Sequence, residues 1–184
     1  MLYDIDTRIF LALNGAHASW LDPVMYWVSD QAFWYPFYAL ILAWLIWTFR
    51  GRSTGIVLCI IATIALGDQF TSSILKPWVA RLRPCHEPSI ERLVHVVWEC
   101  GGPFGFASSH AANTFGFATV LTLLAGQKYP AVRWLYVWAA LVSYSRIYVG
   151  AHYPLDVAVG AGVGILSAFL VTFVYRRIQQ TRTA

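Results

Sequence analysis

The sequence predicts an all-α protein, built as a polytopic bundle of transmembrane helices. Of its 184 residues, 58% are hydrophobic and only 12% are charged, about half the share of charge in an average soluble domain. Nine Trp, ten Tyr and eleven Phe suit aromatic belts at two membrane interfaces. Five apolar stretches come close to the roughly 20 residues that a helix needs to cross a bilayer. We therefore expect one membrane-embedded domain over residues 1–184.

The segment 1–31 precedes the first apolar stretch and is expected to lie in the membrane interface. Its apolar residues recur at helical spacing, which predicts an amphipathic helix. The stretch 21–29 is expected to be a second, half-embedded piece. The apolar stripe of the first helix consists of Ile5, Ile9, Phe10 and Leu13.

The transmembrane core is expected over residues 32–175. Its first span is short, but aromatic residues stand at its ends, as anchoring at the interface predicts. In the last span, Gly160 and Gly164 form a small-xxx-small pattern typical of close helix packing. The predicted spans are 32–49, 55–75, 106–125, 132–149 and 154–175.

Charge distinguishes the two ends of these spans. Loops at one end carry basic residues without acids, whereas loops at the other end mix both signs. The positive-inside rule places the first end in the cytoplasm. We expect a multi-pass protein of the cell (inner) membrane, with its C-terminus cytoplasmic and the loop 76–105 on the extracytoplasmic, periplasmic side. The basic end comprises Arg50, Arg52, Lys128, Arg133, Arg176, Arg177 and Arg182.

The net charge of +4 does not indicate a nucleic-acid partner. The cations are spread along the chain, whereas affinity for nucleic acid needs several clustered phosphate contacts. The expected partners are membrane lipids, and the sequence leaves the oligomeric state open.

The connection between the fourth and fifth spans carries a candidate nucleophile. His152 precedes Pro154, a residue suited to the first turn of a helix. Asp156 follows four positions after His152, so its carboxylate can accept the imidazole Nδ1–H. Nε2 is then free to act as a nucleophile or a base. A His–Asp pair that merely caps the helix is the alternative interpretation.

Ser108, Ser109 and His110 open the third span. At a helix start, unpaired backbone N–H groups point outward and the helix dipole favours an anion. A phosphoryl group can bind these amides and the two hydroxyls, beside His110 as the acid that protonates a leaving oxygen. Simple N-capping by serine is the alternative.

Lys76 and Arg83 follow the second span and supply cations. Taken alone, they fit a juxtamembrane cluster whose side chains snorkel to the interface. Together with Arg146 they would surround two histidines with three positive charges, which suits the charged equatorial oxygens of a phosphorus under attack. His110 and His152 are 42 positions apart, about two crossings of a bilayer. All these candidates are therefore expected at one membrane surface.

The three segments together resemble the motifs of the type 2 phosphatidic acid phosphatase superfamily. The first and third motifs fit without a gap, and the resemblance covers residues 55–175. The middle motif departs, because the family usually has Pro-Ser-Gly-His where this chain has Ala107-Ser108-Ser109-His110. Members commonly have six spans, so the amphipathic N-terminus would replace the first. The matching positions are Lys76, Arg83 and Pro84, then Ser145, Arg146, His152 and Asp156.

The resemblance implies hydrolysis of a lipid phosphate or diphosphate through a phosphohistidine. His152, oriented by Asp156, would attack phosphorus, and His110 would protonate the leaving oxygen and then activate water. No cluster of carboxylates lies near these positions to hold Mg²⁺, so we expect neither a metal nor another cofactor. The expected phosphate-binding residues are Lys76, Arg83, Ser108, Ser109 and Arg146.

Several substrates and activities remain open at this point. Polyprenyl diphosphates, phosphatidylglycerol phosphate, phosphatidic acid and lipid A phosphates all fit such a site. A phosphotransferase that passes the phosphoryl group to a lipid or sugar hydroxyl is one alternative, and a non-catalytic lipid-phosphate carrier is another. Vanadate-dependent haloperoxidases share the motif set, but their sites are in soluble proteins and five spans argue against that class.

Cys85 and Cys100 both fall within the loop 76–105, in an oxidising compartment under the predicted orientation. We expect a disulfide between them. Closing a loop of about 15 residues contributes roughly 3 kcal/mol in the chain-entropy model. His86 and His95 leave a Cys/His metal site as one alternative, and two free thiols are the other.

Overall fold

The computed structural model describes residues 2–183, which form helices joined by loops. In this described part of the chain, an isolated bridge between Leu82 and Phe104 is the sole β-type pairing. The predicted all-α fold is confirmed, whereas the number of spans remains a prediction. The helices are α1 (Leu2–Gly15), α2 (Asp22–Ser29), α3 (Tyr35–Phe49), α4 (Ser53–Gln69), α5 (Lys76–Val79), α6 (Ser109–Ala125), α7 (Leu135–Tyr148) and α8 (Pro154–Thr183).

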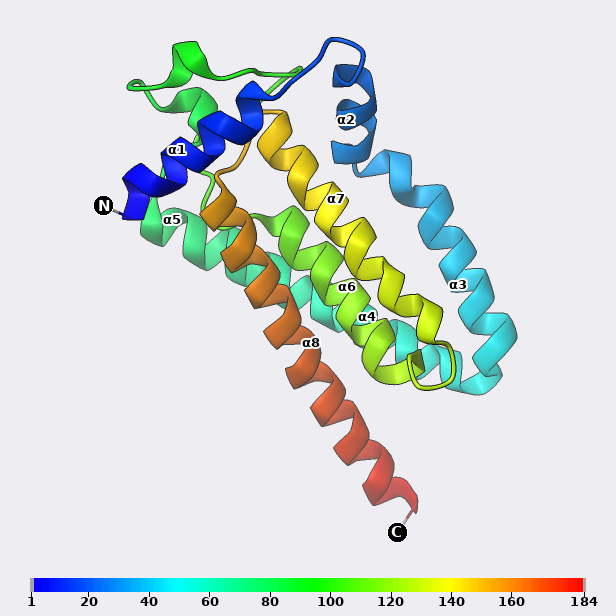
Figure 1. Cartoon of the computed structure of the whole chain (residues 1–184). Helices are drawn as coiled ribbons and strands as arrows, with labels where there is room; N and C mark the ends of the chain where they lie inside the picture. Colours follow the sequence, from blue (N-terminus) through cyan, green and yellow to red (C-terminus); the bar gives the residue numbers. More distant parts are fainter. Residues whose placement is uncertain (1, 184) are drawn as a thin grey trace.

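Among the described residues 2–183, two helical segments are long and apolar enough to cross a membrane, Ala32–Val79 and Pro154–Thr181. The first contains both α3 and α4, which turn back on each other at Arg50–Arg52 (Figure 1). With α6 and α7, these helices occupy the five stretches that the sequence predicted as spans. A π-helical segment, Phe70–Leu75, continues α4 into α5. Its polar residues Thr71 and Ser72 lie against Ser109 at the start of α6.

The boundaries of two spans differ from the prediction. α6 begins at Ser109 rather than at 106, because Ser108 has an extended backbone and its hydroxyl accepts a hydrogen bond from the Ala111 N–H. α8 continues to Thr183, well past the predicted end at 175. Its last turns project beyond the bundle (Figure 1).

Helix α1 buries a different stripe from the one that hydrophobicity predicted. Asp6, Phe10 and Asn14 recur every four residues and are buried, whereas Ile5 and Ile9 are about half exposed. The buried stripe faces the loop between α7 and α8: the Phe10 ring lies edge-on to Tyr153, with centroids 5.3 Å apart. The side chains of Ile5 and Ile9 thus face outward from the protein. An interfacial position of α1 stays a prediction.

Close packing of α6 against α8 sets the position of the two histidine segments. A Cβ atom at Gly160 would clash with the Ser108 carbonyl oxygen, and one at Gly164 would clash with the Ala112 carbonyl oxygen. The two backbones are therefore in direct contact, as the small-xxx-small pattern predicted. The contact joins the first turn of α6 to the second and third turns of α8, so it holds the N-terminal parts of the two helices together.

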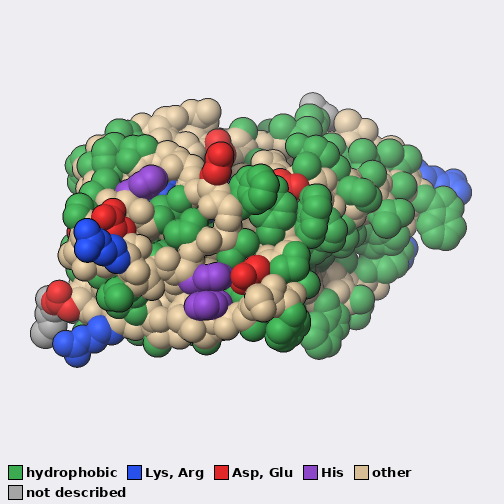
Figure 2. All heavy atoms as spheres, turned by 90° about the horizontal axis from the view of Figure 1, so that it is seen from above, with side chains coloured by type: hydrophobic (Ala, Val, Ile, Leu, Met, Phe, Trp, Pro, Cys, Tyr) green, Lys and Arg blue, Asp and Glu red, His purple; other side chains and the backbone are tan. Residues whose placement is uncertain are grey.

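The two ends of the bundle differ in character. α1, α2 and the loop 80–108 cover one end, and the α3–α4 and α6–α7 turns lie at the other, toward which the C-terminus points (Figure 1). Figure 2 looks down on the end that carries α1 and shows histidine, acidic and basic side chains among apolar ones. The basic residues Arg50, Arg52 and Lys128 lie in the turns of the opposite end.

Candidate active site

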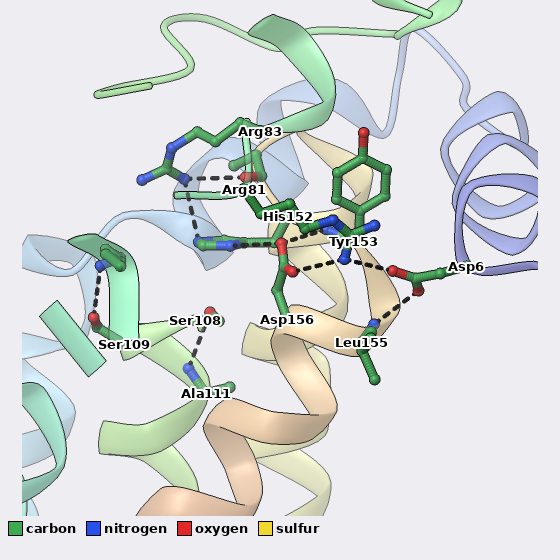
Figure 3. A network of polar contacts seen from close by, with 12 residues as sticks. Asp6, Arg81, Arg83, Ser108, Ser109, Ala111, His152, Tyr153, Leu155 and Asp156 are labelled. Carbon is green, nitrogen blue, oxygen red and sulfur yellow. Dashed lines mark hydrogen bonds and ion pairs between the residues drawn. The ribbon is translucent and has the colours of Figure 1, made fainter. Parts of the chain in front are cut away.

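The α7–α8 loop holds His152 and Asp156 in a buried position. His152 is 2% exposed and Asp156 is 0% exposed. The Nδ1 atom of His152 lies 3.5 Å from Oδ2 of Asp156, which is an ion-pair distance but too long for a strong hydrogen bond. The same Oδ2 accepts the Tyr153 N–H at 3.0 Å. The carboxylate thus both caps the start of α8 and faces the imidazole (Figure 3).

Arg83 fixes the protonation of the His152 ring. Its Nη1 lies 3.2 Å from Nε2 of His152 and also donates to the Ala151 carbonyl at 3.0 Å. A guanidinium can only donate hydrogen bonds, so Nε2 is the acceptor and carries no proton. Burial, followed by the charges of Arg146 and Arg83, lowers the pKa of His152 well below its ordinary value. The ring is therefore neutral, with its lone pair on Nε2.

Asp156 forms an ion pair with Arg81. Arg81 was not among the site residues that the sequence predicted. Arg81 Nη1 lies 3.0 Å from Oδ1 of Asp156 and 2.7 Å from Oδ2 of Asp6. Oδ1 of Asp6 in turn accepts the Leu155 N–H at 2.9 Å, and the Arg81 guanidinium stacks on the Tyr153 ring at 3.7 Å. Helix α1 therefore contributes directly to the support of the α7–α8 loop (Figure 3).

At the start of α6, the two serines have different surroundings. Ser108 is fully buried, and its hydroxyl serves as the helix cap. Ser109 Oγ accepts from Lys76 Nζ at 2.9 Å and contacts the hydroxyls of Thr71 and Ser72 at the same distance. The serine that replaces the family's glycine thus positions Lys76. Burial and the charge of Arg83 lower the pKa of Lys76.

His110 and Arg146 line a cavity of about 290 Å³. Arg146 Nη1 donates to the Ser29 hydroxyl, while its buried Nε has no partner. His110 lines the same cavity, and its backbone carbonyl accepts the Thr114 hydroxyl at 2.8 Å. Arg146 thus presents an unused hydrogen-bonding group in a cavity that His110 shares.

The loop before α6 is tied together by the Cys85–Cys100 disulfide. Beside this bridge, Arg83 Nε donates to the Gly102 carbonyl at 2.6 Å. Cys85, His86 and Cys100 form a group of three potential metal ligands, but the disulfide occupies both sulfur atoms. The bridge closes the loop around Arg83.

The structure brings all the predicted site residues to one end of the bundle, although it leaves their chemical roles untested. Sequence reasoning missed Arg81 and Asp6, which support Asp156, and Thr71 and Ser72, which contact Ser109. Arg81 stands two positions before Arg83, and Asp6 interrupts the apolar stripe of α1. A buried acid in that stripe is a signal for a charged partner.

Comparison with known proteins gives one consistent result. The sequence profile of the PAP2 superfamily matches residues 56–180. A lipid A 4'-phosphatase of Bacteroides thetaiotaomicron is 38% identical over 96% of this chain and 80% of its own. An undecaprenyl-diphosphatase of Sulfolobus acidocaldarius is 30% identical over 90% of this chain and 76% of its own. The crystal structure of a transmembrane phosphatidylglycerolphosphate phosphatase from Bacillus subtilis is 25% identical, with a TM-score of 0.65 over 96% of this chain and 87% of that one.

A helical membrane fold with two histidines and three cations at one end defines a membrane phosphatase of lipid phosphates. The match to the family profile extends over most of the chain and includes every motif of the site. The chain belongs to the PAP2 superfamily.

Proposed function

We propose that the protein hydrolyses a lipid phosphate through a phosphohistidine formed on Nε2 of His152. The observation that supports this most directly is the Arg83 Nη1–His152 Nε2 contact at 3.2 Å, because the guanidinium can only donate, so Nε2 carries a lone pair and no proton. Arg83 can move from the ring to a phosphoryl oxygen when substrate enters. It would then bind the same group that Nε2 attacks.

In the first step, Nε2 forms a bond to phosphorus while the bond to the leaving oxygen breaks. His110 in its protonated form gives a proton to that oxygen, which leaves as an alcohol. Lys76, Arg83 and Arg146 stabilise the charge on the three equatorial oxygens. The product of this step is a phosphoryl group on His152.

In the second step, the neutral His110 accepts a proton from water as the water oxygen bonds to phosphorus. The N–P bond breaks, so inorganic phosphate leaves and His152 regains its lone pair. Asp156 stays near Nδ1 through both steps and stabilises the positive charge that the ring acquires in the phosphorylated state. No step in this sequence requires a metal ion.

The site is proposed to face the extracytoplasmic side of a multi-pass inner-membrane protein, with the C-terminus in the cytoplasm. The charges of the opposite end support this orientation, because Arg50, Arg52, Lys128 and Arg133 lie there and no acid stands among them. The two termini then lie on opposite sides of the membrane.

Among the lipids that fit, we propose a lipid A phosphate monoester as the substrate. The support is the 38% identity to a lipid A 4'-phosphatase, over nearly the whole chain. A polyprenyl diphosphate is the second candidate, favoured by the 30% identity to an undecaprenyl-diphosphatase. Transfer of the phosphoryl group to a lipid or sugar hydroxyl would use the same phosphohistidine.

Phosphate release in EDTA tests the proposal. Detergent-purified wild type should release phosphate from at least one lipid phosphate or diphosphate, and His152→Ala should not. His86→Ala, in the exposed part of the loop, is the matched control and should keep wild-type activity. Release by His152→Ala, or an absolute need for a divalent cation, would contradict the mechanism. A phosphorylated acceptor, formed when a lipid or sugar alcohol is added and without release of inorganic phosphate, would indicate a phosphotransferase.

A further inference from the structure

A cavity lies beside His110. His110 and Arg146 line it, but His152 does not. In an in-line displacement, the attacking and leaving atoms stand on opposite faces of phosphorus. Because the proposed acid His110 lines the cavity and the proposed nucleophile His152 does not, this cavity is the place for the group that leaves with the protonated oxygen.

The size of the cavity limits what that group can be. Its volume is about 290 Å³, at the lower end of the roughly 300–1,000 Å³ of ligand pockets. There is room for one ring or headgroup, whereas long acyl chains must lie outside, along the lipid-facing helices.

The outer wall of the cavity carries hydrogen-bonding side chains of one kind. Asp30 and Gln31 come from the α2–α3 connection, and Glu99 comes from the opposing loop. Two carboxylates and an amide accept hydrogen bonds from hydroxyl and amide groups. The same two carboxylates disfavour an anion at this wall by like-charge repulsion, while Arg146, which also lines the cavity, is the cation assigned to the phosphoryl group.

Two aromatic rings complete the wall. Trp98 is 75% exposed, and its ring lies 5.6 Å from that of Tyr26, at a tilt of 53°. Both residues line the cavity. Large aromatic rings at a pocket mouth offer a flat apolar surface with a polar edge, which matches the C–H face of a sugar ring.

We infer that this cavity is a leaving-group subsite for an uncharged sugar alcohol, with Trp98, Glu99 and Asp30 as its specificity-determining residues. The inference rests on the proposed function, since it assigns the cavity by the direction of attack from His152. A phosphate monoester on a sugar leaves a neutral hydroxyl here after protonation by His110. A polyprenyl diphosphate instead leaves an anionic lipid phosphate, facing two carboxylates.

The test compares three substrates in purified protein: lipid A 4'-phosphate, phosphatidylglycerol phosphate and undecaprenyl diphosphate. Wild type should prefer the first by kcat/KM. Trp98→Ala should lower kcat/KM about tenfold for lipid A 4'-phosphate and by less than about twofold for phosphatidylglycerol phosphate. The double variant Asp30→Asn/Glu99→Gln should raise the relative rate on undecaprenyl diphosphate several-fold, because it removes two negative charges near the leaving phosphate.

Matched controls separate the subsite from general effects. Glu91→Gln removes an exposed carboxylate of the same loop, and Trp134→Ala removes an exposed Trp at the far end of the bundle; both should leave the substrate ranking unchanged. Inhibition by the dephosphorylated lipid A product measures binding to the cavity independently of the rate of phosphoryl transfer. Its inhibition constant should rise in Trp98→Ala but not in Trp134→Ala.

The outcomes distinguish the two proposals. If wild type hydrolyses a substrate but the variants lower all three rates equally, or wild type prefers undecaprenyl diphosphate, the subsite is refuted and the phosphatase mechanism stands. If wild type releases phosphate from none of the three, the proposed function fails, and the subsite fails with it.

Discussion

The proposed nucleophile side of the site, around His152, and the proposed leaving-group side, around His110, are built differently. Around His152, Asp156 contacts Tyr153 N–H and Arg81, and Arg81 in turn contacts Asp6. Around His110, Arg146 Nε is buried without a partner, and both side chains line a cavity. The first side is arranged before substrate binds, and the second keeps its groups free for the substrate. Preorganised groups of the first kind need no rearrangement during the reaction.

After loss of His152 itself, the largest effect is expected on the proposed leaving-group side, at His110. His110→Ala should lower kcat by about 10²–10⁴-fold, the range for loss of a general acid or base. An aryl phosphate with a good leaving group needs no proton, so its first step should lose much less. Pre-steady-state release of the aryl alcohol measures this step. Equal losses for alkyl and aryl substrates would remove His110 from the role of acid.

On the proposed nucleophile side, around His152, we expect substitution of Arg81 to lower the catalytic rate, because Arg81 acts through Asp156 as a positioning residue. Arg81→Gln should lower kcat about 10–100-fold, as loss of an outer-shell partner does elsewhere, with little change in KM because Arg81 does not reach the phosphate. Arg81→Lys should restore part of the rate. Asp6→Asn should give a smaller loss of the same kind. A rise in KM at constant kcat would show instead that Arg81 binds substrate.

A pH profile of kcat/KM tests the lowered pKa of His152 on the proposed nucleophile side. Burial and nearby cations disfavour the charged imidazolium and lower the pKa of His152, so the ring stays neutral below its ordinary pKa of about 6.5. The acid limb of kcat/KM that belongs to His152 should therefore lie below pH 6.5. Arg83→Gln removes a positive charge, so the limb should move upward even as the rate falls. An acid limb above 6.5 in wild type would contradict this assignment.

The smallest effect on activity is expected from the disulfide. Cys85→Ser/Cys100→Ser should lower the free energy of unfolding of the loop by about 3 kcal/mol, and it should reduce activity only a few-fold, because Arg83 keeps its contact with Ala151. Protease sensitivity of the loop 76–105 and phosphate release measure the two effects. Unchanged protection of the loop would show that the bridge is not needed for its order.

The helical bundle and the set of motifs could be predicted from the sequence, because both depend on local signals. Apolar stretches of span length predicted α3, α4, α6, α7 and α8, and spacing along the chain placed His110 and His152 at one surface. The Asp6–Arg81–Asp156 contacts were not predictable, because they join three distant positions by ion pairs that leave no periodic pattern. The hydrophobic stripe of α1 also predicted the wrong buried face. The face of α1 that is buried includes Asp6 and Asn14, whose partners lie elsewhere in the chain.

The central claim is that Nε2 of His152 carries the phosphoryl group, and rapid quenching during turnover of a ³²P-labelled lipid phosphate tests it most directly. We expect an acid-labile, alkali-stable label that maps by peptide digestion to His152 and is absent from His152→Ala. In His110→Ala the label should accumulate, with the aryl phosphate as substrate, because its hydrolysis lacks the base. Label on His110, or single-turnover hydrolysis with no label on any residue, would contradict the account.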